Sequence, residues 1–426
     1  MSLAEGSRKH NRAIAAKLRS SLDFLLQKHV YTYNSRKANL NPARQPRLDS
    51  IDILRGLVIV IMALDHVRDY FSASAGIFEP TDLSRTTIAL FFTRWITHFC
   101  APIFVFLAGT GSYLSLLRGR TPAQLSYYLL TRGLWLVFLE IFVISPLGWS
   151  FQLDLGLIRL QVIWAIGIGM IVLAALCRFH PAIPGAIGLA MIAFQNLLDG
   201  SKLEVWKLLH SITFHQPIPG HRVASLYPLI PWVGVLLAGF GAGVLFRRMD
   251  RVKPLAIAAA TAVGLFTLLR SVNQYGDPAH WSAQSTSAFT VLSWLNVSKY
   301  PPSLDYLLIT LGIAAAMLAT LEANPEFRPK WLETFGRVPL FFYLIHLPLI
   351  HGAAVAIAYI QYGSAEWLFQ DPFGLRRGAN AAPPGYGFDL PIVYMIWFCV
   401  ILATYPVCRR YSVFKRSTTN PVWSYL

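Results

Sequence analysis

Long apolar stretches separated by short polar segments dominate the chain. A helix of about 20 apolar residues matches the hydrocarbon thickness of a bilayer. Backbone groups find no water there, so stretches of this length must be helical. The pattern therefore predicts an all-α fold, a polytopic bundle of about ten transmembrane helices. The predicted spans fall roughly at 51–71, 97–117, 127–147, 157–177, 181–198, 226–246, 254–269, 303–321, 335–360 and 389–408.

Composition supports the same class. Hydrophobic residues make up 55% of the 426 residues and charged residues 14%, and the mean hydropathy is +0.47. Soluble domains carry about 25% charged residues. These values exclude a disordered chain, a collagen and a coiled coil, and they make a soluble enzyme a poor fit. The four cysteines sit in or beside apolar stretches without ligand spacing, which indicates inert packing residues.

The net charge is +16, and the N-terminal segment and the C-terminal tail are both basic. Ten Lys and Arg residues lie in segment 1–50, where 13–30 has the pattern of an amphipathic helix on the cytoplasmic leaflet. The sequence thus divides into a basic N-terminal segment, a membrane domain over 51–408 and a basic tail over 409–426. Lys and Arg outside the spans concentrate on the side that holds both termini, which predicts cytoplasmic termini and attraction to membrane lipids rather than to nucleic acid.

The first span carries more ionisable residues than an apolar helix tolerates without a reason. At about 100° per residue, Asp52, Arg55, His66 and Asp69 share one broad stripe, with Asp65 at its border. Arg55 and His66 are eleven residues apart, about 16 Å along a helix. Charged groups inside a membrane usually face the bundle interior and belong to a site, although a structural ion pair is the alternative.

The ninth span places further polar residues at helical spacing. Tyr343 and His346 are three residues apart and therefore adjacent, and His351 reaches the outer half of the membrane. Pro348 is expected to kink the helix between the two histidines. His98, at the outer start of the second span, lies near the level of His66. Histidines at one depth can bind a metal, but no two share a helix at ligand spacing, so no metal is predicted.

Three arginines lie within about a turn of the cytoplasmic end of their spans: Arg55, Arg132 and Arg337. One interpretation is snorkelling toward lipid phosphate. The other is a phosphate-binding funnel open to the cytosol, because Arg binds phosphate through two hydrogen bonds.

Some polar groups have no obvious partner in the pattern. Glu140 falls in mid-membrane, needs a partner on another helix and is a candidate substrate-binding residue. Trp232 and Lys299 lie at span ends where an acceptor substrate can be held, as does His98. The prolines after Lys299 are also consistent with an ordinary helix start.

Several of these segments resemble those of a known protein family. The segment 47–56, continued through Asp65 and His66, resembles the opening of the heparan-alpha-glucosaminide N-acetyltransferase catalytic-domain family. Segment 101–109 looks like its second-helix motif. Segments 299–303 and 336–339, together with Tyr343 and His346, are similar to those of its bacterial members.

The resemblance implies transfer of an acetyl group from cytosolic acetyl-CoA to a sugar or glycan on the far side of the membrane. Ten residues lie between Arg55 and His66 in the sequence. This is similar to the arginine–histidine spacing of membrane O-acyltransferases that modify bacterial surface glycans, in which the histidine is catalytic. Both resemblances put His66 forward. The heparan acceptor is not carried over, because the N-terminal segment of the lysosomal enzyme is missing and Asp65 stands near the position of an Asn.

We expect His66, tuned by Asp65, to act as a base or as a covalent acetyl carrier. Tyr343, His346 and His351 would assist it, for example by stabilising an oxyanion. Acetyl-CoA would be a co-substrate with its phosphates on the three arginines. The expected location is a bacterial inner membrane, and homo-oligomerisation is left open. The competing class is a transporter or flippase that uses the intramembrane Asp, His and Arg residues.

Overall fold

The computed structural model describes residues 48–153, 155–370 and 381–418, together with 420, 423 and 425. The predicted amphipathic helix at 13–30 lies outside these residues. The predicted tail begins inside the last helix, which continues to Ser417. The order of elements is α2 (Asp49–Phe71), α3 (Ile88–Thr97), α4 (Cys100–Leu117), α5 (Pro122–Leu139), the π-helix η1 (Glu140–Gly148), β1 (Leu157–Leu160), α6 (Val162–Leu176), α7 (Ala182–Phe194), the 3-10 helix η2 (Gln195–Leu198), α8 (Glu204–His210), β2 (Thr213–Ile218), β3 (His221–Ser225), α9 (Leu229–Ala242), the 3-10 helix η3 (Gly243–Arg247), α10 (Val252–Val272), α11 (Ser287–Leu295), α12 (Leu304–Ala323), α13 (Lys330–Arg337), α14 (Pro339–Tyr362), the 3-10 helix η4 (Glu366–Phe369) and α15 (Leu390–Ser417).

The helical membrane architecture is confirmed. In the described part of the chain, seven helices are long and apolar enough to cross a membrane. Two shorter apolar helices, Val162–Leu176 and Ala182–Leu198, occupy the predicted fourth and fifth positions. The first predicted span corresponds to α2, which is long enough but carries several charged residues. Helices therefore form at all ten predicted positions, and the protein is a membrane protein.

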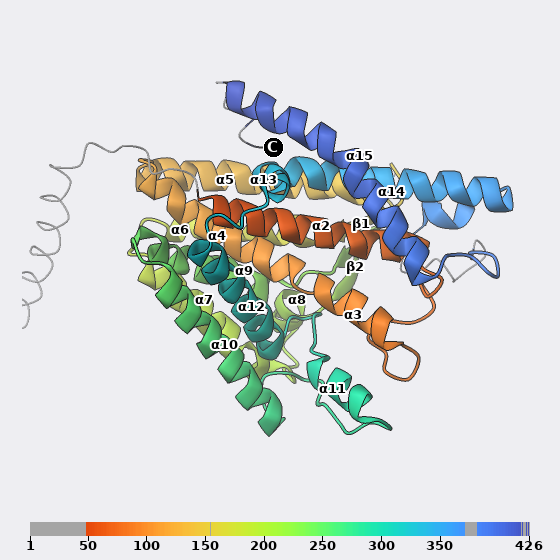
Figure 1. Ribbon diagram of the computed structural model, residues 1–426, viewed down its shortest axis with the longest axis horizontal. Helices are drawn as coiled ribbons and strands as arrows, with labels where there is room; N and C mark the ends of the chain where they lie inside the picture. The colour runs from red at the N-terminus through yellow and green to blue at the C-terminus, as the bar shows by residue number, and fades with distance from the viewer. Residues whose placement is uncertain are drawn as a thin grey trace, which may run out of the picture. The chain divides into compact units, whose positions relative to one another are not determined.

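Helix α2 lies at the centre of the described bundle (Figure 1). Most of its residues are buried, including Asp52, His66 and Arg68. It packs against six other helices: α3, α4, α12, α13, α14 and α15. Its contact with α13 is very close, because a Cβ built on Gly56 would lie 1.9 Å from the backbone oxygen of Leu332. The polar residues of α2 are therefore held inside the protein rather than against lipid.

The predicted span at 335–360 is wrong in one respect, because two helices meet inside it. Helix α13 ends at Arg337, and α14 begins at Pro339. Val338 between them has φ −130° and ψ 49°, outside the helical region. A residue before proline is disfavoured in helical geometry, and proline itself suits the first position of a new helix. The Gly336-Arg337-Val338-Pro339 motif is therefore a helix junction.

The predicted fourth span, 157–177, is wrong at its start, and the segment 199–225 between predicted spans contains a short helix and two strands. Residues Leu157–Leu160 form β1, which pairs in parallel with β3, and β3 pairs antiparallel with β2. Gly220 has φ +83° and turns the chain between β2 and β3. A short apolar stretch fits a strand as well as a helix by its pattern, so tertiary pairing decides. Within this small sheet, β1 packs against η1 and α6.

Segment 109–111 packs closely where α4 crosses α9. A Cβ on Gly109 would lie 1.9 Å from the backbone oxygen of Leu236, and one on Gly239 would lie 2.1 Å from that of Phe106. Thr110 donates a hydrogen bond from Oγ1 to the Gly239 carbonyl at 3.0 Å. Small residues at such crossings let two membrane helices approach closely.

Gly109→Ala is expected to destabilise the protein by about 1–3 kcal/mol, because the added methyl group pushes α4 and α9 apart. The melting temperature of the purified protein in detergent measures this. Gly264→Ala in α10 is the matched control, since no heavy atom lies within 4 Å of a Cβ built there. Equal melting temperatures for the two variants would show that the crossing does not depend on Gly109.

Candidate active site

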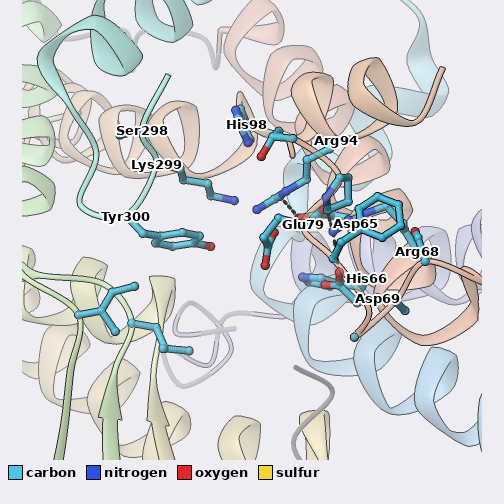
Figure 2. A pocket seen from close by; sticks show the side chains of 18 of the residues that line it. Asp65, His66, Arg68, Asp69, Glu79, Arg94, His98, Ser298, Lys299 and Tyr300 are labelled. Carbon is cyan, nitrogen blue, oxygen red and sulfur yellow. Dashed lines mark hydrogen bonds and ion pairs between the residues drawn. The ribbon is translucent and has the colours of Figure 1, made fainter. Parts of the chain in front are cut away.

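A pocket of about 790 Å³ opens at the C-terminal end of α2 (Figure 2). Ligand sites for small molecules typically span about 300–1,000 Å³. One wall comes from α2, α3 and the segment between them, and the other from the segments before α9 and α12. The charged and histidine residues of its lining are Asp65, His66, Arg68, Asp69, Glu79, Arg94, His98 and Lys299.

His66 is buried and forms a side-chain pair with His346 of α14. Its Nδ1 lies 2.8 Å from Nε2 of His346, and the two rings stack with centroids 5.0 Å apart. Trp149 packs edge-on against the His66 ring at 5.2 Å, and Tyr343 does so at 6.4 Å. The ring is therefore held on three sides. The expectation that Tyr343 and His346 lie beside His66 agrees with this geometry.

The hydrogen-bond partners define which nitrogen of His66 carries the proton. Nδ1 of His346 faces two carbonyl oxygens, of Phe342 at 2.9 Å and of Tyr343 at 3.0 Å. A carbonyl oxygen only accepts, so His346 Nδ1 carries a proton and its Nε2 has the lone pair. His66 Nδ1 must then donate to His346. The lone pair of neutral His66 is consequently on Nε2, the other nitrogen of a ring that lines the pocket.

Asp65 lies close enough to interact electrostatically with His66, but its hydrogen bonds go to arginines. Its carboxylate accepts hydrogen bonds from Arg94 at 2.8 Å and from Arg68 at 2.9 Å. Arg68 also donates to Asp69 at 2.6 Å. Consecutive residues of a helix point about 100° apart, so Asp65 and His66 face different neighbours. The two acidic groups and the two arginines form a continuous network that joins the end of α2 to α3.

The opposite wall is formed mainly by the segment 296–300 and by Tyr227. Lys299 is buried, with 9% of its surface exposed, and its ammonium lies 5.1 Å from the centre of the Tyr300 ring. Tyr300 packs edge-on against Tyr227 at 5.8 Å. Burial raises the pKa of the Tyr227 phenol well above its ordinary value, and Tyr300 adds to the shift. This wall thus combines aromatic faces with a cation.

His98 also lines the pocket, and its backbone carbonyl accepts a hydrogen bond from Tyr306 at 2.7 Å. His351 lies elsewhere, stacked between Tyr70 and Phe151 at 4.9 and 4.0 Å. Its Nε2 bonds to the Leu368 carbonyl at 2.7 Å. The predicted grouping of His351 with His66 is therefore not formed. No group of three or more metal-ligating side chains occurs in the described ranges.

The three predicted phosphate-binding arginines lie on three different helices, Arg55 on α2, Arg132 on α5 and Arg337 on α13. Arg55 donates to the Leu107 carbonyl at 2.8 Å and lies 3.5 Å from Asp52. Arg337 pairs with Glu333 on α13. Close packing of α13 on α2 puts these two arginines in the same region of the bundle. Arg132 lies on α5, with its guanidinium 5.9 Å from the Tyr128 ring.

Glu140 and Trp232 are buried and are absent from the described lining of the pocket. The expected partner of Glu140 on another helix is confirmed: its carboxylate accepts a hydrogen bond from the Trp164 backbone at 3.0 Å. A carboxylate near the N-terminus of a helix interacts favourably with the helix dipole, so Glu140 stabilises α6. Trp232 packs against Tyr227, with ring centroids 5.0 Å apart. It therefore supports the aromatic wall from behind.

Comparison with known protein families identifies the family to which the chain belongs. Residues 47–276, more than half of the chain, match the model of the family described as heparan-alpha-glucosaminide N-acetyltransferase, catalytic. The chain belongs to this family. Comparison with curated proteins finds no match. The family is one of acetyltransferases, so the pocket and its histidine pair lie in an acetyltransferase-type protein.

The match to the acetyltransferase family includes His66, Asp65 and Arg94 but ends before Lys299 and His346. Sequence reasoning missed Arg94, which completes the charged network. The available signal was an arginine inside the apolar segment Ile88–Thr97, most of which lies between the first two predicted spans. It also missed Trp149, because the π-helix that carries the chain to it has no simple sequence pattern.

Asp65→Asn is expected to destabilise this acetyltransferase-family protein by about 3–5 kcal/mol, because it leaves two buried guanidinium groups without their shared carboxylate. The melting temperature in detergent is the measurement. Asp250→Asn, on an exposed loop, is the matched control and should change little. A variant at position 65 that melts with the wild type would contradict a structural role for the network.

Proposed function

We propose that the protein transfers an acetyl group from cytosolic acetyl-CoA to a sugar or glycan acceptor on the outer side of the membrane. The observation that carries the proposal is the pairing of His66 with His346. It leaves a basic nitrogen, Nε2, on a ring that lines a polar pocket of a family of acetyltransferases. Acyl transfer needs such a base, and a neutral imidazole supplies one near neutral pH.

In the direct route, His66 Nε2 removes the proton of an acceptor hydroxyl or amine. The acceptor atom then attacks the thioester carbonyl, the carbon–sulfur bond breaks, and the coenzyme A thiolate takes the proton from Nε2. In the two-step route, Nε2 itself attacks the thioester carbonyl, the carbon–sulfur bond breaks, and coenzyme A leaves as the thiolate. The acceptor atom then attacks the acetyl group on Nε2, the carbon–nitrogen bond breaks, and the acceptor proton neutralises the thiolate. Both routes use the same lone pair, and both require the tautomer that His346 supports.

The donor would approach from the opposite end of α2. Arg55 lies eleven residues before His66, about 16 Å along the helix. Arg337 lies on α13, which packs against the same part of α2. Phosphate groups of acetyl-CoA bound by these residues, and by Arg132 at the same membrane level, would let the thioester reach toward His66. Acetyl-CoA acts here as a co-substrate, and no metal is invoked.

The orientation follows from the distribution of Lys and Arg. With both termini in the cytoplasm, the C-terminal end of α2 and the pocket face outward, whereas Arg55 faces the cytosol. An outward pocket with tyrosines beside charged side chains suits a sugar, which presents both apolar faces and hydroxyl groups. A bacterial inner membrane is the location we propose.

His66→Ala is expected to abolish acetyl-CoA-dependent acetylation, because no other group described in the pocket has the same base geometry. Mass spectrometry of cell-envelope glycans from cells with wild-type or variant protein measures this as loss of a mass difference of one acetyl group. His180→Ala, at an exposed position, is the control for the general effect of removing a histidine. Undiminished acetylation by the variant at position 66 would refute the proposal.

His346→Phe is expected to lower kcat by about 10²-fold or more without raising KM for acetyl-CoA, because His66 then loses the acceptor that fixes its tautomer. His346→Gln, whose amide oxygen can accept the same hydrogen bond, should retain part of the activity. Single-turnover kinetics on folded, monodisperse protein measures both variants. Equal kcat values for the Phe variant and the wild type would exclude a positioning role for His346.

A further inference from the structure

The tryptophan that packs edge-on against His66 comes from an irregular part of the chain. Trp149 follows the π-helix η1 and is buried, and its ring lies 5.2 Å from that of His66. Phe151, two residues later, belongs to neither a helix nor a strand and has φ +49°. A bulky residue rarely adopts this left-handed conformation unless its surroundings hold it there. Contacts from other elements must therefore keep the segment 149–151 in place.

Tyr70 of α2 holds the backbone of Trp149. Its hydroxyl donates a hydrogen bond to the Trp149 carbonyl at 2.6 Å, and the Gly148 carbonyl lies 3.5 Å from the same hydroxyl. Tyr70 is four residues after His66, so the two side chains are neighbours on one face of α2. This face therefore carries both the imidazole and the hydroxyl that fixes the residue packed against it.

His351 of α14 holds the same segment by ring stacking. Its ring stacks on Phe151 with centroids 4.0 Å apart, and on Tyr70 with centroids 4.9 Å apart. Its Nε2 donates to the Leu368 carbonyl at 2.7 Å, which fixes the rotation of the ring. Its Nδ1 is buried and has no hydrogen-bond partner within the described ranges. In this stack His351 is a flat, oriented ring rather than a carrier of protons.

The end of α2 that bears Tyr70 is itself anchored to the segment before α15. The Tyr386 hydroxyl donates to the Tyr70 carbonyl at 2.6 Å. The backbone nitrogen of Phe388 donates to the Phe71 carbonyl at 2.7 Å, and that of Ala73 donates to the Phe388 carbonyl at 2.9 Å. Because this end of α2 is fixed, a change in the Tyr70 or His351 side chain acts on the segment that carries Trp149.

We propose that Tyr70 and His351 are positioning residues for His66 that act through Trp149. The inference rests on the proposed acetyl transfer, in which His66 Nε2 is the reacting atom. Trp149 limits rotation of the His66 ring away from His346, and Tyr70 and His351 keep Trp149 where it does so. His351, which the sequence grouped directly with His66, thus contributes through the stack and not by contact with the substrate.

Tyr70→Phe tests the hydrogen bond, because it keeps the ring that stacks on His351 and removes only the hydroxyl. It is expected to lower kcat by about 10-fold with little change in KM for acetyl-CoA, since misplacing a catalytic base affects the transition state more than substrate binding. Single-turnover and steady-state kinetics on folded, monodisperse protein measure this. Tyr362→Phe is the matched control, because it also removes a hydroxyl that donates to a backbone carbonyl, that of Gly385 at 3.2 Å. Equal kcat values for the two variants would overturn the proposal.

Two substitutions at position 351 test the ring stack in the same assay. His351→Phe keeps an aromatic ring between Tyr70 and Phe151 and should retain most of the wild-type kcat. His351→Ala removes the ring and should lower kcat by about 10-fold. If His351→Phe is as slow as His351→Ala, the imidazole itself is required and the positioning role is refuted.

Nitrogen NMR of protein labelled at its histidine nitrogens tests the positioning without turnover. The His66 signals are those missing from His66→Ala, and in the wild type we expect the single neutral tautomer with its proton on Nδ1. Tyr70→Phe should shift or broaden these signals, whereas Tyr362→Phe should not. Unchanged His66 signals in Tyr70→Phe would overturn the inference even if acetyl transfer is confirmed. Changed signals in a protein that transfers no acetyl group would support the positioning contacts and reject the proposed function instead.

Discussion

The structure depends on one constraint: a helix with acidic, basic and imidazole side chains is buried in the middle of an apolar bundle. Each such group needs a partner from another element, since an unpaired charge in a membrane interior is costly. Asp65 therefore fixes α3 through Arg94, and His66 fixes α14 through His346. The positions of the surrounding helices follow from the polar side chains of α2 as much as from apolar packing.

The two ends of α2 meet this constraint differently. At the N-terminal end, glycines allow backbone contact: Gly56 touches Leu332, and a Cβ on Gly336 would lie 1.7 Å from the Asp52 carbonyl. At the other end, long side chains keep the neighbours apart and a pocket remains. The junction at Val338 separates α13 from α14. Helix α13 can therefore pack tightly at one end of α2, while α14 carries His346 to His66.

Much of the fold was predictable because bilayer thickness sets helix length, and the polar stripe of α2 was visible because helical periodicity is fixed. Partner choice was not predictable in this way. Asp65 and His66 are neighbours in sequence yet bind Arg94 and His346, which depends on how α3 and α14 approach. Hydropathy also did not predict the helix junction before Pro339 or the four-residue strand β1. A junction and a short strand interrupt an apolar stretch without changing its composition.

The histidine pair also bears on the choice between an enzyme and a proton-coupled transporter. A relay that runs through this pair would require His346 to pass on the proton of Nδ1, but two backbone carbonyls hold that proton at 2.9 and 3.0 Å. Carbonyl oxygens at neutral pH do not take up protons, so the chain of transfer ends there. A base that exchanges protons only on its pocket side suits chemistry on a bound molecule. The arrangement of His66 and His346 therefore favours local catalysis over transmembrane proton transport.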